Sequence, residues 1–575
     1  MTFRAPVDDL AFCLTEVAGA GALMGEGGFP EFDADILRAV LEAGASLADE
    51  VLAPIDAEGD RVGARFENGA VIAAPGFKEA FRAYAEGGWV GLSADPAHGG
   101  QGLPRALSLA VNEMINAANM SFALNPLLTA SAIEALTAHG DTRQQALYLP
   151  RLISGEWTGT MNLTEAHAGT DLGLIRTRAE PAEDGQGWRL TGEKIFITWG
   201  DHDCADNIVH LVLARLPDAP AGVKGISLFL APKRLVGEDG ALGEVNRLRP
   251  AGIEHKLGIH ASPTCVMLFE GARAELVGRP NEGLAHMFTM MNAARLNVGI
   301  QGVGVAERAY QRALAYALER RQSRSPWSAE APARLFDLPD IRRRLALTKA
   351  RIEAARGICL SCAVAADLAA VSPDPAVREA AAMREALLTP IAKAWSTDLG
   401  VEAASEAIQI HGGMGYIEET GAAQHYRDAR IAPIYEGTNA IQALDLIGRK
   451  LAAGEGAAMR SLAADVRATV ARLEDAPARR LEAGVAALET ATAWMVERQG
   501  SDDALAAACA YLKLAGEVTG GWMLAKGALA GGGRRSALLS IYAEQALAGA
   551  PALAEAVMAG AAGLRELTPE ALGAR

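Results

Sequence analysis

The sequence predicts an α+β protein of several domains, in which helical domains precede and follow a middle β-domain. Apolar residues recur at three- and four-residue spacing up to about residue 152 and again from residue 281 to the C-terminus. Between these regions lie short apolar segments rich in β-branched and aromatic residues, bounded by Gly, Pro and Asp. The chain has 575 residues, which exceeds what one compact core holds. We therefore expect a helical–β–helical architecture.

Five parts follow from these changes of pattern: an N-terminal arm over 1–32, a helical domain over 33–157, a β-domain over 158–280, a helical bundle over 281–454 and a further helical domain over 455–575. The first helical domain shows two apolar faces, one with Ile36, Val40 and Ala43 and one with Leu107, Val111 and Met114. The last domain shows two stripes, Leu462, Val466, Val470 and Leu473, and Leu481, Val485 and Leu488. We interpret GGGRR at 531–535 as a loop with a solvated basic pair.

Composition excludes several classes of function. A net charge of −16 argues against a general nucleic-acid or anionic-membrane binder. Six cysteines form no disulfide framework, and no export signal or charge-free membrane-spanning run is present, so we expect a cytoplasmic protein without membrane insertion. The histidines show no metal-ligand spacing, so we expect no metal. Cys359 and Cys362, in the run CLSC, are interpreted as buried small residues of an alanine-rich helix.

The segment 427–450, RDARIAPIYEGTNAIQALDLIGRK, carries the most specific chemical signal. Glu436 follows an apolar stretch and precedes Gly437, where the backbone can approach a ligand closely. Residues 440–446 are expected to be helical, with Thr438 or Asn439 as the cap. Glu436 is therefore a candidate base of raised pKa, although a surface glutamate at a helix N-terminus is the simpler alternative.

Two segments around the start of the β-domain suit a polar ring-bearing ligand. MNLTEAHAGTDL at 161–172 offers backbone amides and the hydroxyls of Thr164 and Thr170 near Gly169, and Asp171 can cap a following turn. KIFITWG at 194–200 is a strand that can lie along a flat heterocycle while Thr198 donates a hydrogen bond. An ordinary loop and a core strand remain the alternatives for these two segments, with Trp199 in the core or at an interface.

Two further segments end helices. YALERRQSRSPW carries Arg320 and Gln322 near a helix C-terminus, where guanidinium groups bind phosphate or simply cap the helix dipole. QIHGGMGY at 409–416 ends a helix in a glycine-rich turn whose amides can wrap a pyrophosphate. GVGVAE at 302–307 is mid-helix and is not a dinucleotide fingerprint.

Taken in order, these segments resemble the acyl-CoA dehydrogenase family over nearly the whole chain. TEAHAGTD, KIFITWG, EHKLGIHASPTCVMLFEG, ALERRQSR, QIHGGMGY and RDARIAPIYEGT all stand in family order, and the last is the most specific. The resemblance implies an N-terminal helical domain, a middle β-barrel or sandwich, and a C-terminal four-helix bundle. The length and the extra C-terminal helices resemble a long bacterial branch that includes 3-(methylthio)propionyl-CoA dehydrogenases.

The resemblance implies FAD as cofactor and an acyl-CoA as substrate in fatty-acid β-oxidation. Glu436 would remove the α-proton, and the β-hydrogen would leave as hydride to the flavin N5, which gives a trans-2-enoyl-CoA. The implied substrate contacts are Thr170, Arg295, Tyr435 and Gly437. The implied FAD contacts are Met161, Leu163, Thr164, Gly169, Thr170, Phe196, Ile197, Thr198, Arg320, Gln322, Gln409, Gly413 and Thr438, some of them across a dimer interface.

Position 294, where some members keep their base, is Ala294, so Glu436 has no rival. The sequence also departs from the family pattern. Ala166-His167 replaces Pro-x, Thr170 replaces Ser, Trp199 replaces Asn, Phe-Gly is missing after Gln322, and Ala440 stands where many members have Gln. These changes affect individual FAD hydrogen bonds.

The resemblance implies electron-transfer flavoprotein as electron acceptor and a homodimer in which the extra helices cover surface that shorter members use for pairing. An acyl-CoA oxidase that passes electrons to oxygen remains an alternative within the fold. A flavin-bearing nucleic-acid-binding protein of the alkylation-response type and a cofactor-free scaffold are alternatives of other classes, and balanced charge after Gly454 argues against the former. Acyl chain length and branching stay open.

Overall fold

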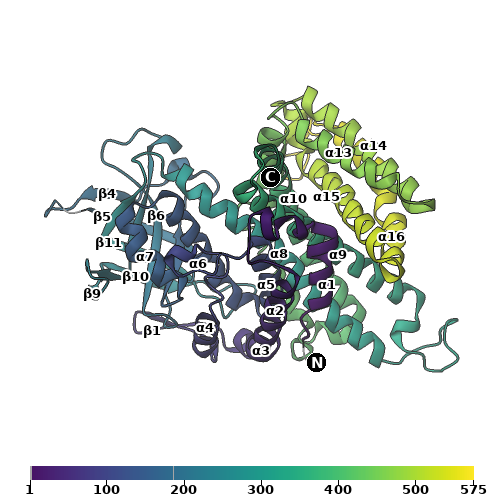
Figure 1. The fold of residues 1–575 in the computed structure, drawn as a ribbon, viewed down its shortest axis with the longest axis horizontal. Helices are drawn as coiled ribbons and strands as arrows, with labels where there is room; N and C mark the ends of the chain where they lie inside the picture. The colour runs from purple at the N-terminus through teal and green to yellow at the C-terminus, as the bar shows by residue number, and fades with distance from the viewer. Residues whose placement is uncertain (1–2, 186, 575) are drawn as a thin grey trace.

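The computed structural model describes residues 3–185 and 187–574. In Figure 1 the strands gather on the left, long helices cross the centre, and the C-terminal helices lie at the upper right. The predicted fold class is confirmed, since the elements run as a helical region, a β-domain, a helical bundle and a further helical region. The residue boundaries assigned to the five parts stay predictions.

Six helices form most of the first helical region. They are α2 (Ala34–Ser46), α3 (Ala53–Val62), α4 (Phe77–Glu86), α5 (Arg105–Ala118), α6 (Met120–His139) and α7 (Thr142–Ile153). The face of Leu107, Val111 and Met114 on α5 is buried as predicted. The face predicted for α2 is wrong, because Ile36 is 38% exposed and the helix buries Leu37, Leu41 and Gly44 instead. A Cβ on Gly44 would lie 3.0 Å from the Met114 Cε, so the close approach of α2 to α5 selects this adjacent stripe.

A hairpin interrupts this helical region and was not predicted. Strands β1 (Arg65–Glu67) and β2 (Ala70–Ile72) are joined by Asn68-Gly69, both with positive φ, the pair that a tight hairpin turn favours. The Val71 backbone N–H donates to Asp201 Oδ2 at 3.0 Å, and Val71 packs into the core of the β-domain. The hairpin therefore belongs structurally to the β-domain.

The β-domain is a closed arrangement of strands. Its seven-stranded sheet contains β3 (Trp157–Asn162), β4 (Arg178–Pro181), β5 (Trp188–Thr198), β6 (Asn207–Arg215), β7 (Ile226–Pro232), β10 (Leu248–Ile253) and β11 (Thr264–Val277), and β8 (Arg234–Val236) pairs separately with β9 (Leu242–Val245). Since β7 pairs with both β11 and β6, the order β11–β5–β4–β6–β7 returns to β11. This ring forms a small barrel around the apolar residues of β5, β6, β7 and β11.

The helical bundle is built on three long helices, α8 (Gly283–Glu319), α9 (Pro339–Val371) and α10 (Pro375–His411), with the shorter α11 (Ala422–Ala429) and α12 (Asn439–Asp445). Helices α8 and α10 run parallel and very close. A Cβ on Gly299 would lie 2.9 Å from the Ala392 carbonyl oxygen, and one on Gly302 would lie 2.3 Å from that of Ser396. Only glycine permits this approach. GVGVAE lies within α8, as predicted.

Helix α9 is long and apolar enough to cross a membrane by length and composition alone. Most of its apolar stretch, 72%, is buried inside the protein, as in the core helix of a bundle. Cys359 and Cys362 lie in this helix and are fully buried, which confirms their interpretation as core residues. All six cysteines are free thiols.

The C-terminal region consists of α13 (Ala457–Val470), α14 (Asp475–Glu497), α15 (Asp502–Gly531), α16 (Gly533–Gln545) and α17 (Ala550–Met558). Leu462, Val466, Leu481, Val485 and Leu488 are fully buried, as their stripes predict, while Val470 and Leu473 are half-buried. Helix α15 packs along α9 and α10, so this region extends the bundle.

The prediction for GGGRR is wrong for the loop and for Arg535, while Arg534, whose side chain is 64% exposed, is solvated as predicted. Only Gly532 separates α15 from α16, so the segment is not an extended loop. The Arg535 side chain is 14% exposed, and its guanidinium carbon lies 3.4 Å from the centre of the Phe12 ring. Arg534 forms an ion pair with Asp9. The basic pair is bound by the N-terminal helix α1 (Val7–Phe12), a contact between opposite ends of the chain that local sequence does not reveal.

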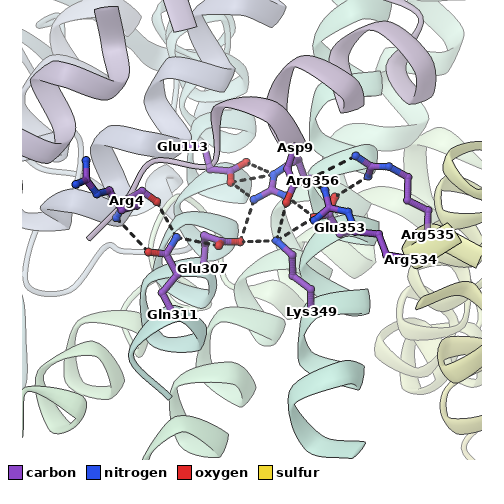
Figure 2. A network of polar contacts seen from close by, with 10 residues as sticks. All are labelled: Arg4, Asp9, Glu113, Glu307, Gln311, Lys349, Glu353, Arg356, Arg534 and Arg535. Atoms are coloured by element: carbon purple, nitrogen blue, oxygen red, sulfur yellow. Dashed lines mark hydrogen bonds and ion pairs between the residues drawn. The ribbon is translucent and has the colours of Figure 1, made fainter. Parts of the chain in front are cut away.

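Figure 2 shows the charged network to which these arginines belong. Arg356 on α9 is fully buried and donates to Glu113 Oε1 at 3.0 Å and to Glu307 Oε2 at 3.1 Å. Lys349 Nζ lies 3.1 Å from Asp9 Oδ2 and 2.9 Å from Glu353 Oε1. The network therefore joins the N-terminal helix, α5, the bundle and α16.

Candidate active site

Glu436 lies on a strained turn between α11 and α12. Its φ is +56° and that of Gly437 is +82°, so two successive residues have left-handed backbones. Such strain in a non-glycine residue is typical of functional sites. The Thr438 hydroxyl accepts a hydrogen bond from the Ile441 backbone N–H at 3.3 Å, which confirms Thr438 as the cap of α12.

The electrostatic environment of Glu436 raises the pKa of its carboxyl. Its side chain is half-buried, and burial raises the pKa of its carboxyl to about 7, against the opposing effect of the positive charges on Arg295 and Lys393. The raised pKa expected from the sequence is thereby confirmed. A carboxylate with a pKa near neutrality is strong enough to take a proton and still ionised in half or more of the molecules at physiological pH.

Several buried polar atoms around Glu436 have no hydrogen-bond partner in the part of the chain that the structure describes. They are Arg295 Nε, Gln301 Nε2 and Gln442 Oε1. Arg295 is 6% exposed, and Phe288 stacks on its guanidinium at 5.7 Å. Gln301 accepts a hydrogen bond from the Tyr435 hydroxyl. Since buried polar atoms are normally satisfied, these indicate a site for a polar ligand.

The sequence reasoning missed four residues of this site: Gln301, Lys393, Asn439 (considered only as a cap) and Gln442. Gln442 donates to the Glu436 carbonyl oxygen at 3.2 Å, and Lys393 donates to that of Gly437 at 2.9 Å. Lys393 is fully buried within α10. A lysine inside an otherwise apolar helical stretch, TPIAKAW, was the signal that could have identified it.

In the β-domain, the structure brings the residues predicted around Thr164 next to those around Thr198. The Ile195 backbone N–H donates to the Thr164 carbonyl oxygen at 2.9 Å. Lys194 Nζ donates to the Leu163 carbonyl oxygen at 2.8 Å. Met161 lies on β3, while Gly169 and Thr170 follow a tight turn closed by backbone hydrogen bonds between Glu165 and Ala168. The two predicted segments therefore form one surface.

Strand β5 carries a bulge where this surface is most open. The register of β5 with β11 shifts between Cys265 and Met267, and Phe196 has a φ of +60°. This bulge turns the Phe196 side chain outward, 58% exposed, while Ile197 beside it is buried. Thr164 and Thr198 are half-buried and Thr170 is exposed, so their hydroxyls are accessible to a ligand.

A buried ion pair fixes this surface. Lys194 Nζ lies 2.9 Å from Glu165 Oε1, and both side chains are buried. Burial alone would raise the pKa of the Glu165 carboxyl, but Lys194 and hydrogen bonds from Thr177 hold it below its ordinary value. Since neither charge is left unpaired, the loop and the strand keep one relative position.

Trp199, which stands where the family has Asn, is buried as core. Its indole N–H donates to the Ser121 carbonyl oxygen at 3.3 Å, and its ring stacks on Phe77 at 6.3 Å. The substituted residue therefore joins the β-domain to the N-terminal helices.

Four predicted cofactor contacts lie far from Glu436 along the bundle. Arg320 directly follows α8, whereas Arg295 lies in the first half of this helix, and 25 residues of helix span about 37 Å. Gln409 and Gly413 lie at the corresponding end of α10, where the Tyr316 and His411 rings stack at 4.4 Å. Arg320, Gln322, Gln409 and Gly413 are all exposed. Within one chain these residues form a second group, separate from the one around Glu436.

A cavity of about 290 Å³ lies elsewhere, between the end of α3 and the connection from β10 to β11. Asp60, Lys256 and His260 line it, and it includes none of the predicted site residues. Across residues 3–185 and 187–574, no three His, Cys, Asp or Glu side chains are arranged to hold a metal ion.

This architecture defines a class of protein: the chain belongs to the acyl-CoA dehydrogenase family, and it is therefore an oxidoreductase. Three family models match in order, the acyl-CoA dehydrogenase N-terminal domain at 35–156, the middle domain at 160–272 and the C-terminal domain at 281–452. A fourth, described as acetyl-CoA dehydrogenase C-terminal like, matches 462–568. The additional helices are thus also a known module.

Among individual relatives, the 3-methylmercaptopropionyl-CoA dehydrogenase of Ruegeria pomeroyi is 45% identical over 539 residues, which cover 92% of this chain and 91% of that protein. A butyryl-CoA dehydrogenase of Syntrophomonas wolfei is 35% identical over 447 residues, 76% of this chain and 73% of the relative.

Solved structures share the fold. Caenorhabditis elegans ACDH-11, solved in complex with C11-CoA, superposes with a TM-score of 0.80 at 22% identity and covers 95% of this chain and 92% of its own. An acyl-CoA dehydrogenase from Bacillus anthracis, complexed with FAD, has a TM-score of 0.73 at 21% identity, with 92% and 88% covered. The butyryl-CoA dehydrogenase of Megasphaera elsdenii gives 0.60 at 28% identity over 72% of this chain and 98% of its own.

Proposed function

We propose that this protein dehydrogenates an acyl-CoA thioester between Cα and Cβ, with Glu436 as the base that removes the α-proton. One observation carries the proposal: Glu436 is a half-buried carboxylate of raised pKa on a strained turn. Its own backbone N–H finds no acceptor within the described part of the chain. That amide is available to a thioester carbonyl, whose oxygen gains negative charge as the α-proton leaves.

The family is FAD-dependent, and the residues present fit this cofactor. Thr164, Thr170 and Thr198 offer accessible hydroxyls on one surface, and the bulge presents Phe196 outward beside them. These donors suit the polar edge of an isoalloxazine, and the aromatic side chain suits its apolar part. When bound, FAD supplies the acceptor for the β-hydride.

The protein's own residues then prepare the proton transfer. Burial keeps the Glu436 carboxylate basic, and the positive charges of Arg295 and Lys393 keep a fraction of it ionised at neutral pH. Gly437 lets the turn approach the substrate without a side chain in the way. The Tyr435 hydroxyl donates a hydrogen bond to Gln301, which fixes the Tyr435 side chain next to the base.

The first test compares Glu436→Gln with wild-type holoenzyme mixed with an acyl-CoA. Because glutamine cannot accept the proton, we expect flavin reduction in stopped flow to slow by about 10²- to 10⁴-fold. Glu419→Gln, at an exposed position, is the matched control and should reduce its flavin at the wild-type rate. Wild-type bleaching in Glu436→Gln would remove the base from the mechanism.

For the substrate, we propose 3-methylmercaptopropionyl-CoA, supported by the 45% identity to the Ruegeria pomeroyi enzyme over nearly the whole of both chains. A panel of acyl-CoAs with an artificial electron acceptor tests this. The thioether substrate should give the highest kcat/KM, and a higher value for straight or branched chains of another length would assign the enzyme to those instead.

We also propose a cytoplasmic homodimer that passes electrons to electron-transfer flavoprotein and contributes to β-oxidation. Support for the dimer comes from Arg320, which lies about 37 Å along α8 from Arg295, and from Gln409 near the corresponding end of α10; both suit a cofactor held mainly by a second copy. Light scattering should give twice the 60.0 kDa chain mass. Peroxide formation without added acceptor would favour an oxidase.

A further inference from the structure

Lys393 occupies an unusual environment beside the proposed base. Its side chain is fully buried, and its ammonium donates to the Gly437 carbonyl oxygen at 2.9 Å and to Asn439 Oδ1 at 3.0 Å. No carboxylate within the described residues lies close enough to Nζ to form an ion pair. A buried ammonium held only by neutral oxygens is costly, so its presence calls for a compensating role.

Asn439 is fixed so that its oxygen faces Lys393. Its amide nitrogen donates to the Ala394 carbonyl oxygen at 3.0 Å, to Thr397 Oγ1 at 3.1 Å and to Asp398 Oδ1 at 2.7 Å. These acceptors all lie on α10, within five residues of Lys393. Lys393, which lies on α10, and Asn439, which α10 anchors, therefore both hold the turn that carries Glu436. We call these two residues the clamp.

The clamp contacts the turn at Gly437, beside Glu436, where the backbone is strained. Gly437 follows Glu436, and both residues have positive φ. Gln442 donates to both of their carbonyl oxygens, at 3.2 Å and 3.4 Å, from the α12 side. Lys393 on α10 also donates to the Gly437 carbonyl oxygen, so this oxygen accepts hydrogen bonds from two different helices.

The charged and titratable groups around Glu436 come from several elements. Arg295 faces it from α8, Lys393 from α10, and Tyr435 precedes it on the same turn. Asp445 and Arg449 act on Arg295, and Asp398 acts on Lys393. Burial lowers the pKa of the Lys393 ammonium to about 7, against the opposing effect of Glu436 and Asp398. Removing either cation therefore changes the field at Glu436.

We propose that Lys393 is a positioning residue for the reaction, which holds the Glu436–Gly437 turn in its reactive conformation and, while its ammonium is protonated, supplies positive charge to the ionised base. This inference rests on the proposed function of Glu436. Because its side chain is fully buried, Lys393 acts through the turn and through its charge.

Three holoenzyme variants separate geometry from charge. Lys393→Met removes both the hydrogen bonds and the charge. Lys393→Arg keeps a charge but changes the length and shape of the side chain. Asn439→Ala removes one of the two clamp residues and leaves the charge of Lys393. The readout is the pH profile of single-turnover flavin reduction by an acyl-CoA, with flavin absorbance and circular dichroism as checks of folding.

In Lys393→Met we expect the acid limb of the profile to move up by about one pH unit, because a lost nearby cation disfavours the carboxylate. The plateau rate should fall by about tenfold or more, as a base loses its alignment. Lys393→Arg and Asn439→Ala should both lower the plateau. Asn439→Ala should keep the wild-type limb, and Lys393→Arg, which stays charged throughout this range, should not move the limb to higher pH.

A folded Lys393→Met variant with the wild-type limb and plateau would overturn the proposal. If that variant does not fold, Asn439→Ala decides, since a wild-type plateau there would show that the clamp does not position the base. Failure of the proposed function is distinct, because it appears as wild-type flavin reduction in Glu436→Gln.

Discussion

At the scale of single residues, one side chain has conflicting requirements. As the proposed base, Glu436 must be buried enough to be basic and charged enough to accept a proton. Burial moves its pKa up, and two cations, Arg295 and Lys393, move it back toward the ordinary value. The result is a pKa of about 7, so the carboxyl titrates near neutral pH.

This balance predicts the pH dependence of the reaction. Since only the ionised carboxylate accepts a proton, flavin reduction should be constant above about pH 8 and fall as the pH drops through about 7, roughly tenfold per unit well below it. Stopped-flow rates over this range measure it. A fall in rate centred near the ordinary glutamate pKa of about 4.3 would show that burial does not control the pKa of Glu436.

At the scale of elements, the site depends on two local irregularities. A bulge in β5 turns Phe196 outward, and a strained turn before α12 presents Glu436. Both are held by buried lysines, Lys194 in the β-domain and Lys393 in the bundle. Each lysine donates to a backbone carbonyl oxygen of the adjoining loop, which fixes loops that local sequence preferences leave free.

The close packing of α8 on α10 positions Arg295 and Lys393 relative to each other, and Gly302 permits it. Gly302→Ala places a Cβ 2.3 Å from the Ser396 carbonyl oxygen and should cost about 1–3 kcal/mol, the usual range for overpacking. Gly448→Ala, also helical but with nothing within 4 Å, should be neutral or stabilising by about 0.4–1 kcal/mol. Chemical denaturation of the two variants compares them, and equal stabilities would contradict the packing argument.

At the scale of the whole molecule, a charged network holds the two ends of the chain to the bundle (Figure 2). Asp9 on α1 contacts Lys349 on α9 and both Arg534 and Arg535 on α16. Burial would raise the pKa of the Asp9 carboxyl, but Lys349 and Arg356 lower it well below its ordinary value. Its stabilising contribution is therefore present above about pH 4 and is lost as the pH falls toward the folded-state pKa.

Asp9→Ala should release this contact. Because Lys349 keeps Glu307 and Glu353 as partners and loses only one of three carboxylates, we expect a loss of about 1–3 kcal/mol and faster proteolysis near α16. Asp8→Ala is a matched control, since Asp8 is 84% exposed and, among the residues that the structure describes, pairs only with Arg38; its effect should stay within about 0.5 kcal/mol. Identical melting and cleavage of the two variants would show that Asp9 does not hold the ends together.

Much of this fold could be predicted from the chain alone. Hydrophobic periodicity indicated helices, then strands, then helices, and local preferences indicated that Thr438 or Asn439 caps α12, of which the structure selects Thr438, and that CLSC is core. A hairpin was missed although Asn68-Gly69 marks one, because the surrounding helical pattern dominated the interpretation. Motif order indicated the family and Glu436, since that signal lies within one short segment.

Only the tertiary structure decided which distant groups meet. The face that α2 buries depends on Met114 of α5, and the state of Arg534 and Arg535 depends on Asp9, more than 500 residues away. The roles of Lys393 and Gln301 likewise arise from helices that pack beside Glu436. The amino-acid sequence by itself determined the features that depend on periodicity and short motifs, because these signals lie within local stretches of the chain. Burial and electrostatic pairing are sums over neighbours in space, and these fix the pKa of the base.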